Sequence, residues 1–253
     1  MRADWDALAQ PAEANANGQM VGMRVAWPGA RHPPRQTLEG RYCRVEPLDR
    51  ARHGEQLFDE LHKIPGGANW TYLSHGPFPC LEDWLQWVSA NSLRDDPQFY
   101  AIVDQADGAA IGLCSYLRIA PEDGSIEVGF LNFSPRLQRS RQATEAMYLM
   151  MRRAFELGYR RYEWKCDAQN APSVKAALRL GFTFEGLFRQ ARVNKAAIAT
   201  RRGSLFWMAS GRRGAPHWKP GWMRTISTRA AGSEAVCRRL LRRSRKSRGG
   251  LLA

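Results

Sequence analysis

The alternation of apolar and polar residues predicts two strands on either side of one long helix in the middle of the chain. Residues 125–133 (SIEVGFLNF) and 160–166 (RRYEWKC) are rich in β-branched and aromatic residues and lack a helical period, so each predicts a strand. Between them, residues 143–157 repeat apolar side chains at helical spacing. The segment therefore predicts a strand, a turn, a helix and a second strand in that order.

A shorter helix and one more strand are expected directly afterwards. Asn170 suits an N-cap, and Pro172 suits the first turn of a helix over residues 173–180, where a missing N–H costs little. Gly181 is a typical stop at a helix C-terminus, and residues 182–189 (FTFEGLFR) alternate as a strand does.

The first half of the chain is interpreted by the same rules. Residues 1–36 are rich in Ala, Asn, Gly and Pro and predict an extended arm, partly packed at best. Ala106-Asp-Gly108 indicates a hairpin turn. Strands are expected over 40–46, 98–103 and 109–118, helices over 50–61 and 79–91, and an irregular loop over 63–78. The fold class is therefore α+β, with a mixed, mostly antiparallel sheet flanked by helices.

Three motifs follow one another in the second half of this pattern. They are Gln138-Arg-Ser-Arg-Gln-Ala143, Asn170-Ala-Pro-Ser173 and Leu180-Gly-Phe-Thr-Phe-Glu-Gly186. In this order and spacing, the chain resembles the GNAT N-acetyltransferases over about residues 38–195, in the branch of ribosomal-protein N-terminal (RimJ/RimL-like) acetyltransferases. It departs from the family pattern at Arg141, where glycine is usual. If that position needs a positive φ, an Arg there disfavours the turn; if it does not, the Arg adds a phosphate contact.

The resemblance implies an acyltransferase that moves an acetyl group from acetyl-CoA to a primary amine, on a protein N-terminus or a small molecule. A helix N-terminus attracts a diphosphate, and Arg139 and Arg141 add charge there. An ordinary connection with solvated arginines is the alternative. The expected cofactor-binding residues are Phe130, Leu131, Gln138, Arg139, Ser140, Arg141, Gln142, Ala143, Asn170 and Ser173.

Two residues are candidates for catalysis. Glu127 lies in the strand that faces the cofactor in this fold and could accept the amine proton through water; a solvent-facing position on that strand is the alternative. Asn170 could order the cofactor or a water near the thiol, or serve only as a helix cap. Ala177 stands where many relatives have a tyrosine acid, so a tyrosine in that role is excluded.

The acceptor side is expected in the irregular loop. Trp70, Tyr72 and His75 lie on the segment that covers the acceptor in similar proteins, so they are candidate substrate-binding residues. A loop packed by its own aromatic side chains explains them equally well.

Charge divides the chain unevenly. Residues 1–195 hold 24 basic and 23 acidic side chains, whereas residues 196–253 hold 14 basic side chains and one acid, Glu234. A near-neutral body with a separate basic tail differs from a basic nucleic-acid-binding domain. A non-catalytic CoA-binding or nucleic-acid-associating protein that uses this tail is the alternative function; otherwise no nucleic-acid partner is expected.

The tail is also unusual in kind, because disordered basic tails are seldom rich in tryptophan. Restoring one nucleotide before its first codon allows residues 196–205 to be read as GRNRDTAWFS, which resembles the last strand of this acetyltransferase branch. We interpret residues 196–253 as an out-of-frame translation, with a genuine basic tail as the alternative. We expect residues 196–204 to form a poor last strand and residues from about 206 onward to be irregular. The predicted domains are an arm over 1–36, the acetyltransferase over 37–195 and the tail over 196–253.

The remaining composition restricts partners and location. The five cysteines show no metal-binding spacing and fit a reduced cytoplasm, and the histidines form no ligand pattern, so no metal is expected. No apolar run approaches the length of a membrane span and no signal pattern opens the chain, so no membrane partner is expected. A cytoplasmic monomer or homodimer fits best.

Overall fold

The computed structural model describes residues 12–24, 26–188, 191 and 195, together with the backbone of 203–209. Its main sheet has eight strands in the order β3-β4-β5-β6-β7-β8-β10-β9, and every neighbouring pair is antiparallel except β7 and β8. The strands are β3 (Leu38–Glu39), β4 (Cys43–Pro47), β5 (Gln98–Asp104), β6 (Ala110–Ala120), β7 (Ser125–Phe133), β8 (Arg161–Asp167), β9 (Thr183–Phe188) and β10 (Gly203–Ala209). The predicted α+β class with a mixed, mostly antiparallel sheet is confirmed.

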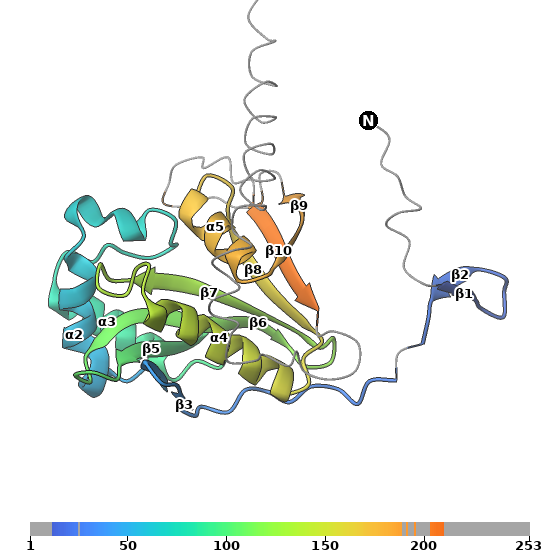
Figure 1. The fold of residues 1–253 in the computed structure, drawn as a ribbon, viewed down its shortest axis with the longest axis horizontal. Helices are drawn as coiled ribbons and strands as arrows, with labels where there is room; N and C mark the ends of the chain where they lie inside the picture. Colours follow the sequence, from blue (N-terminus) through green and yellow to red (C-terminus); the bar gives the residue numbers. More distant parts are fainter. Residues whose placement is uncertain (1–11, 25, 189–190, 192–194, 196–202, 210–253) are drawn as a thin grey trace, which may run out of the picture.

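Helices cover both faces of the sheet (Figure 1). The pair α2 (Arg50–His62) and α3 (Leu81–Ser92) packs on one face, and α4 (Arg141–Glu156) and α5 (Ala171–Arg179) pack on the other. Strand β5 shows how the two cores are separated, because Tyr100 and Ile102 enter the α4 core while Phe99, Ala101 and Val103 enter the α2–α3 core. Alternate side chains of one strand therefore bury on opposite faces.

The helix boundaries follow their caps. Asp49 accepts a hydrogen bond from the backbone N–H of Arg52 at the start of α2 (2.8 Å), and Asn170 accepts one from Ser173 at the start of α5 (3.2 Å). Helix α4 begins at Arg141 and not near Ala143 as predicted, because Ser140 Oγ accepts from Ala143 N (3.0 Å) and so acts as the N-cap.

The arm combines two kinds of structure. Residues 26–37 run along the body, where Trp27 Nε1 donates to the Gly158 carbonyl (2.9 Å) and Gln98 Nε2 donates to the Pro33 carbonyl (3.1 Å). Before them, the short strands β1 (Ala12–Ala14) and β2 (Met20–Gly22) form a separate exposed hairpin that the sequence did not predict.

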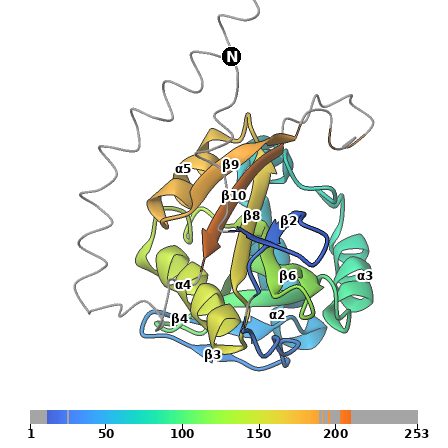
Figure 2. The ribbon, with the colours of Figure 1, turned by 90° about the vertical axis from the view of Figure 1, so that its right-hand side faces the viewer.

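The last strand corrects the prediction for the tail. Residues 206–209 are not irregular: β10 pairs with both β8 and β9, and these three strands lie side by side in Figure 2. The reason is that strand pairing uses backbone groups, which any side chain leaves available, and the slot between β8 and β9 offers two partners at once. The sheet thus extends past the predicted boundary at Lys195. The rest of the tail lies outside the described residues.

Candidate active site

Two parallel strands separate in the middle of the sheet and leave a cavity. Residues Ser125–Val128 of β7 pair with Arg161–Trp164 of β8, and beyond these residues the described strands continue without pairing to each other. Phe130, just past the separation, has a φ of 50°, which marks a bend in β7. The cavity measures about 360 Å³. Its lining comes from β7, β8, the end of β6, the start of α5, the loop after η1 (Pro65–Trp70), the end of β9 and Ala191.

Glu127 lies one residue before the last pair of these two strands and lines the cavity. Its side chain is 4% exposed, and its Oε2 accepts from Arg118 Nη1 (2.5 Å) and Lys165 Nζ (2.9 Å). Its other oxygen, Oε1, lies beside Gly129, where a Cβ would be 3.6 Å away. Among the described residues no donor reaches Oε1. Arg118 and Lys165 thus hold Glu127 through Oε2, and Oε1 can accept a hydrogen bond from a ligand or a water.

Arg118 and Lys165 were not predicted as site residues. Arg118 has a φ of 48°, and the carboxylate of Asp96 fixes this conformation by accepting from the N–H groups of Arg118 and Ile119 (both 3.0 Å). The bend lets the Arg118 side chain reach Glu127. Strict alternation along RYEWKC places Lys165 on the same face as Glu163, and this was the one sequence signal that could have indicated a charged face.

The ion pairs continue outward from Glu127. Lys165 also pairs with Glu163, and Arg161 Nε donates to Glu163 Oε1 (2.6 Å). Burial raises the pKa of Glu163, but the hydrogen bonds from Lys165 and Arg161 outweigh it and hold the pKa below its usual range. Arg161 Nη2 then pairs with Glu185 on β9 (2.7 Å). Cations and carboxylates therefore alternate from the cavity to the edge strand.

Asn170 and Ser173 reach the cavity from α5. Asn170 caps this helix, as predicted, and both residues belong to the cavity lining. Ser173 Oγ accepts from Trp164 Nε1 (3.0 Å), which fixes the indole ring at the point where β8 leaves β7. Nearby, burial raises the pKa of the Cys166 thiol to about 11, so this thiol stays protonated at neutral pH.

The loop after η1 closes one side of the cavity. Tyr72 lines it and donates from its hydroxyl to the Gln169 carbonyl (3.2 Å), while Lys195 Nζ donates to the Trp70 carbonyl (2.7 Å). Of the predicted substrate contacts, Tyr72 is the one placed at the cavity. Trp70 is 1% exposed and packs edge-on against Trp84 and Phe78, and His75 stacks on Trp87 with ring centroids 4.5 Å apart. Both therefore belong to an aromatic core.

The turn before α4 lies outside this cavity, at the end of β7. Arg139 carries the positive φ of the turn (58°), whereas Arg141 is the first residue of the helix. Arg141 therefore needs no glycine-like conformation, and its guanidinium carbon lies 5.9 Å from the centre of the Tyr42 ring. Gln138 Nε2 donates to the Phe133 carbonyl (2.9 Å), and Ala143 is buried. Arg139 and Arg141 are both exposed, beside a helix N-terminus.

Among the described residues, no group of three His, Cys, Asp or Glu side chains could hold a metal ion, and no helix is long and apolar enough to cross a membrane. Cys43, Cys80, Cys114 and Cys166 are free thiols.

Comparison with known proteins bears on the family and the fold of this chain. The model of the acetyltransferase (GNAT) domain matches residues 49–183. A GCN5-related N-acetyltransferase from Brucella melitensis is 36% identical, with a TM-score of 0.71 over 81% of this chain and 90% of that chain. The N-acetyltransferase p20 of Bacillus licheniformis is 28% identical over 122 residues, 47% of this chain and 68% of that protein. RimL, the ribosomal L7/L12 α-N-protein acetyltransferase, is 20% identical with a TM-score of 0.59 over 69% of this chain and 94% of that chain, which shows the shared fold alone.

The fold and these matches define an acetyltransferase. The chain belongs to the acetyltransferase (GNAT) family.

Proposed function

We propose that the protein transfers an acetyl group from acetyl-CoA to a primary amine, on a protein N-terminus or a small molecule, and that Glu127 receives the amine proton. The observation that carries this proposal is the place of Glu127. It is a buried carboxylate that lines the cavity where β7 and β8 separate, with two cations on one oxygen and no donor from the described residues on the other. A proton acceptor must lie within reach of the reacting amine, directly or through one water.

The described residues fit acetyl-CoA in two places. The part of β7 beyond Val128 has no β8 partner, so its backbone can hydrogen-bond the amide groups of the pantetheine arm of acetyl-CoA between the strands. The exposed Arg139 and Arg141, beside the N-terminus of α4, suit the diphosphate. Acetyl-CoA supplies a thioester carbonyl, which the amine attacks. A C–N bond forms, the C–S bond breaks, and the thiolate leaves.

The chain contributes to this step through Glu127, the backbone of β7 and the side chains that line the cavity. Glu127 takes the amine proton, through a water where the distance requires one. Backbone N–H groups of β7 polarise the carbonyl oxygen. Asn170 and Ser173, at the start of α5, hold the cofactor side of the cavity, and Tyr72 contacts the acceptor. The two cations on Glu127 keep it in place while the amine enters.

We also propose that residues 196–253 are translated out of frame and that this ending impairs the enzyme. In support, Lys195 Nζ donates to the carbonyl of Trp70, the residue directly before the loop that closes the acceptor side, so the change begins next to a residue that contacts this part of the chain.

The experiment replaces Glu127 by Gln and measures acetyl transfer to a panel of peptides and small amines. General base catalysis typically contributes about 10²- to 10⁴-fold, so we expect a loss of at least about 100-fold in kcat/KM. The melting-temperature rise produced by acetyl-CoA should persist, because Glu127 acts on the amine.

Glu163→Gln is the matched control, because this carboxylate shares Lys165 but does not line the cavity. It should retain most of the activity. An equal loss in both variants, or nearly full activity of Glu127→Gln, would refute the role of Glu127.

A further inference from the structure

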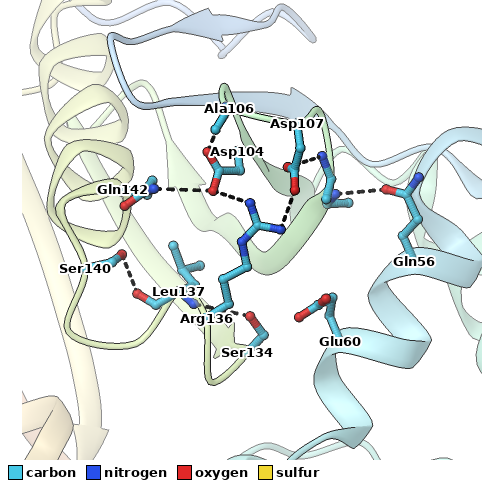
Figure 3. A network of polar contacts seen from close by, with 12 residues as sticks. Gln56, Glu60, Asp104, Ala106, Asp107, Ser134, Arg136, Leu137, Ser140 and Gln142 are labelled. Carbon is cyan, nitrogen blue, oxygen red and sulfur yellow. Dashed lines mark hydrogen bonds and ion pairs between the residues drawn. The ribbon is translucent and has the colours of Figure 1, made fainter.

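The turn that precedes α4 is fastened to a part of the chain far away in sequence. Arg136, in this turn, reaches the hairpin between β5 and β6 and pairs with two carboxylates there (Figure 3). Its Nη2 lies 2.6 Å from Asp104 Oδ2, and its Nη1 lies 2.7 Å from Asp107 Oδ2. Hydrogen bonds to two carboxylates at once fix both the position and the plane of a guanidinium.

Asp104 connects the two ends of the turn. Besides Arg136, its Oδ2 accepts from Gln142 Nε2 (3.3 Å), and Gln142 lies in the first turn of α4. Its Oδ1 accepts from the N–H of Ala106 (2.9 Å), which holds the carboxylate in the hairpin itself. The Asp104 side chain is 5% exposed, so water competes little for these bonds. One buried carboxylate thus holds residues on both sides of the segment 138–141.

The rest of the turn is a compact unit. Leu137 is buried in the core, its N–H donates to Ser134 Oγ (3.3 Å), and Ser140 Oγ lies 2.6 Å from the Leu137 carbonyl. These bonds set the shape of the turn, and the N-cap bond from Ala143 N to Ser140 Oγ joins it to α4. The contacts of Asp104 add a link from both ends of the turn to the end of β5.

Charge gives Arg136 a second role. Two carboxylates close to an anion site would repel a diphosphate, and Arg136 neutralises part of this charge. The hydrogen bond from Arg136 lowers the pKa of Asp107, and the hydrogen bonds to Asp107 and Asp104 raise the pKa of Arg136. The guanidinium is therefore engaged by the hairpin, while Arg139 and Arg141 remain exposed to an anion.

We propose that Asp104, acting through Arg136 and Gln142, is a positioning residue that aims the turn 138–143 at the diphosphate of acetyl-CoA. This rests on the proposed function, in which that turn binds the diphosphate. Asp104 itself touches neither substrate. Its effect should therefore appear in the binding of acetyl-CoA and be absent for a donor that lacks the diphosphate.

The test compares two acetyl donors, acetyl-CoA and S-acetyl-pantetheine, which carries the same thioester without the diphosphate and nucleotide. We expect Asp104→Asn to raise the KM for acetyl-CoA about tenfold, equivalent to about 1.4 kcal/mol, with kcat within about twofold of the parent. Its KM for S-acetyl-pantetheine should be unchanged. Asp107→Asn, which removes only the exposed partner of Arg136, should change either KM by less than about twofold.

The outcomes separate the inference from the proposed function. If the parent protein does not prefer acetyl-CoA over S-acetyl-pantetheine, the diphosphate does not bind at the turn. The diphosphate site of the proposed function and the positioning role of Asp104 are then both wrong. If the parent prefers acetyl-CoA but Asp104→Asn leaves that preference intact, or weakens both donors equally, the positioning role alone is wrong. Arg136→Lys, which keeps the charge, is measured in parallel, and we expect it to lose part of the preference for acetyl-CoA over S-acetyl-pantetheine. If Asp104→Asn does not fold, Arg136→Lys tests the positioning role by the same two criteria.

Discussion

Glu145 offers a sharp test of how α4 is fixed to the sheet. It lies in the second turn of the helix, is 6% exposed, and accepts from three consecutive backbone N–H groups. Its Oε1 accepts from Arg41 (2.8 Å), and its Oε2 accepts from Tyr42 (2.6 Å) and Cys43 (2.9 Å). The loop comes so close that a Cβ at Gly40 would lie 2.6 Å from this carboxylate. We consider the replacement of Glu145 by Ala and by Gln.

The magnitude follows from which donors lose their partner. Cys43 is fully buried, so its N–H would be left unpaired at a cost of about 1–3 kcal/mol. Arg41 and Tyr42 are more accessible, and water can replace Glu145 there, so each bond costs about 0.5–1.5 kcal/mol. Glu145→Ala should therefore destabilise the protein by about 2–6 kcal/mol. Glu145→Gln keeps one acceptor oxygen but turns an NH₂ toward a donor, and should cost about 2–3 kcal/mol.

The assay is equilibrium unfolding in urea, with the m-value used to check that the unfolded states are comparable. Glu156→Gln is the matched control, because this residue is on the same helix but exposed, in a pair with Arg152 at 3.4 Å. It should change the free energy of unfolding by less than about 0.5 kcal/mol. If Glu145→Gln is no more destabilising than Glu156→Gln, the three hydrogen bonds do not fix the helix and the reasoning is wrong.

Two further predictions concern pH and the chain end. Burial, with a smaller effect of Lys195, lowers the pKa of His75 to about 4. The unfolded chain takes up this proton near pH 6.5, so stability is full above that pH and falls by up to about 3 kcal/mol as the pH drops to 4. His75→Phe should flatten this dependence in urea unfolding, and an unchanged curve would contradict it. Replacing residues 196–253 by the restored-frame sequence should raise both the melting temperature and acetyl transfer; the idea of an impaired ending fails if neither rises.

Local patterns were enough to predict most of the fold. The caps at Asp49 and Asn170, the hairpin turn at 106–108 and the helical period before Leu157 depend on neighbours in sequence, and the structure confirms each of them. The final strand was misplaced because the tail carries little alternation, whereas the backbone of β10 pairs with two strands that come from elsewhere in the chain.

The site was less accessible to sequence reasoning. Glu127, Arg118 and Lys165 come from three different strands, and Arg118 reaches the carboxylate only because Asp96 holds its backbone at a positive φ. A loop has no period to show which side chains turn inward. The sequence therefore leaves two interpretations of Trp70 and His75 open, substrate contacts or an aromatic loop packed on itself, and in the structure both rings pack against aromatic residues of α3.

The slot that holds β10 has a consequence for how this chain end can vary. Strands β8 and β9 flank it, and Arg161 on β8 pairs with Glu185 on β9 across it. A slot that selects its strand through main-chain amides accepts many sequences. The β10 segment is thus a place where the whole sequence can be replaced while its pairing with β8 and β9 is kept. The same strand could also be supplied as a separate peptide, by splitting the gene before it.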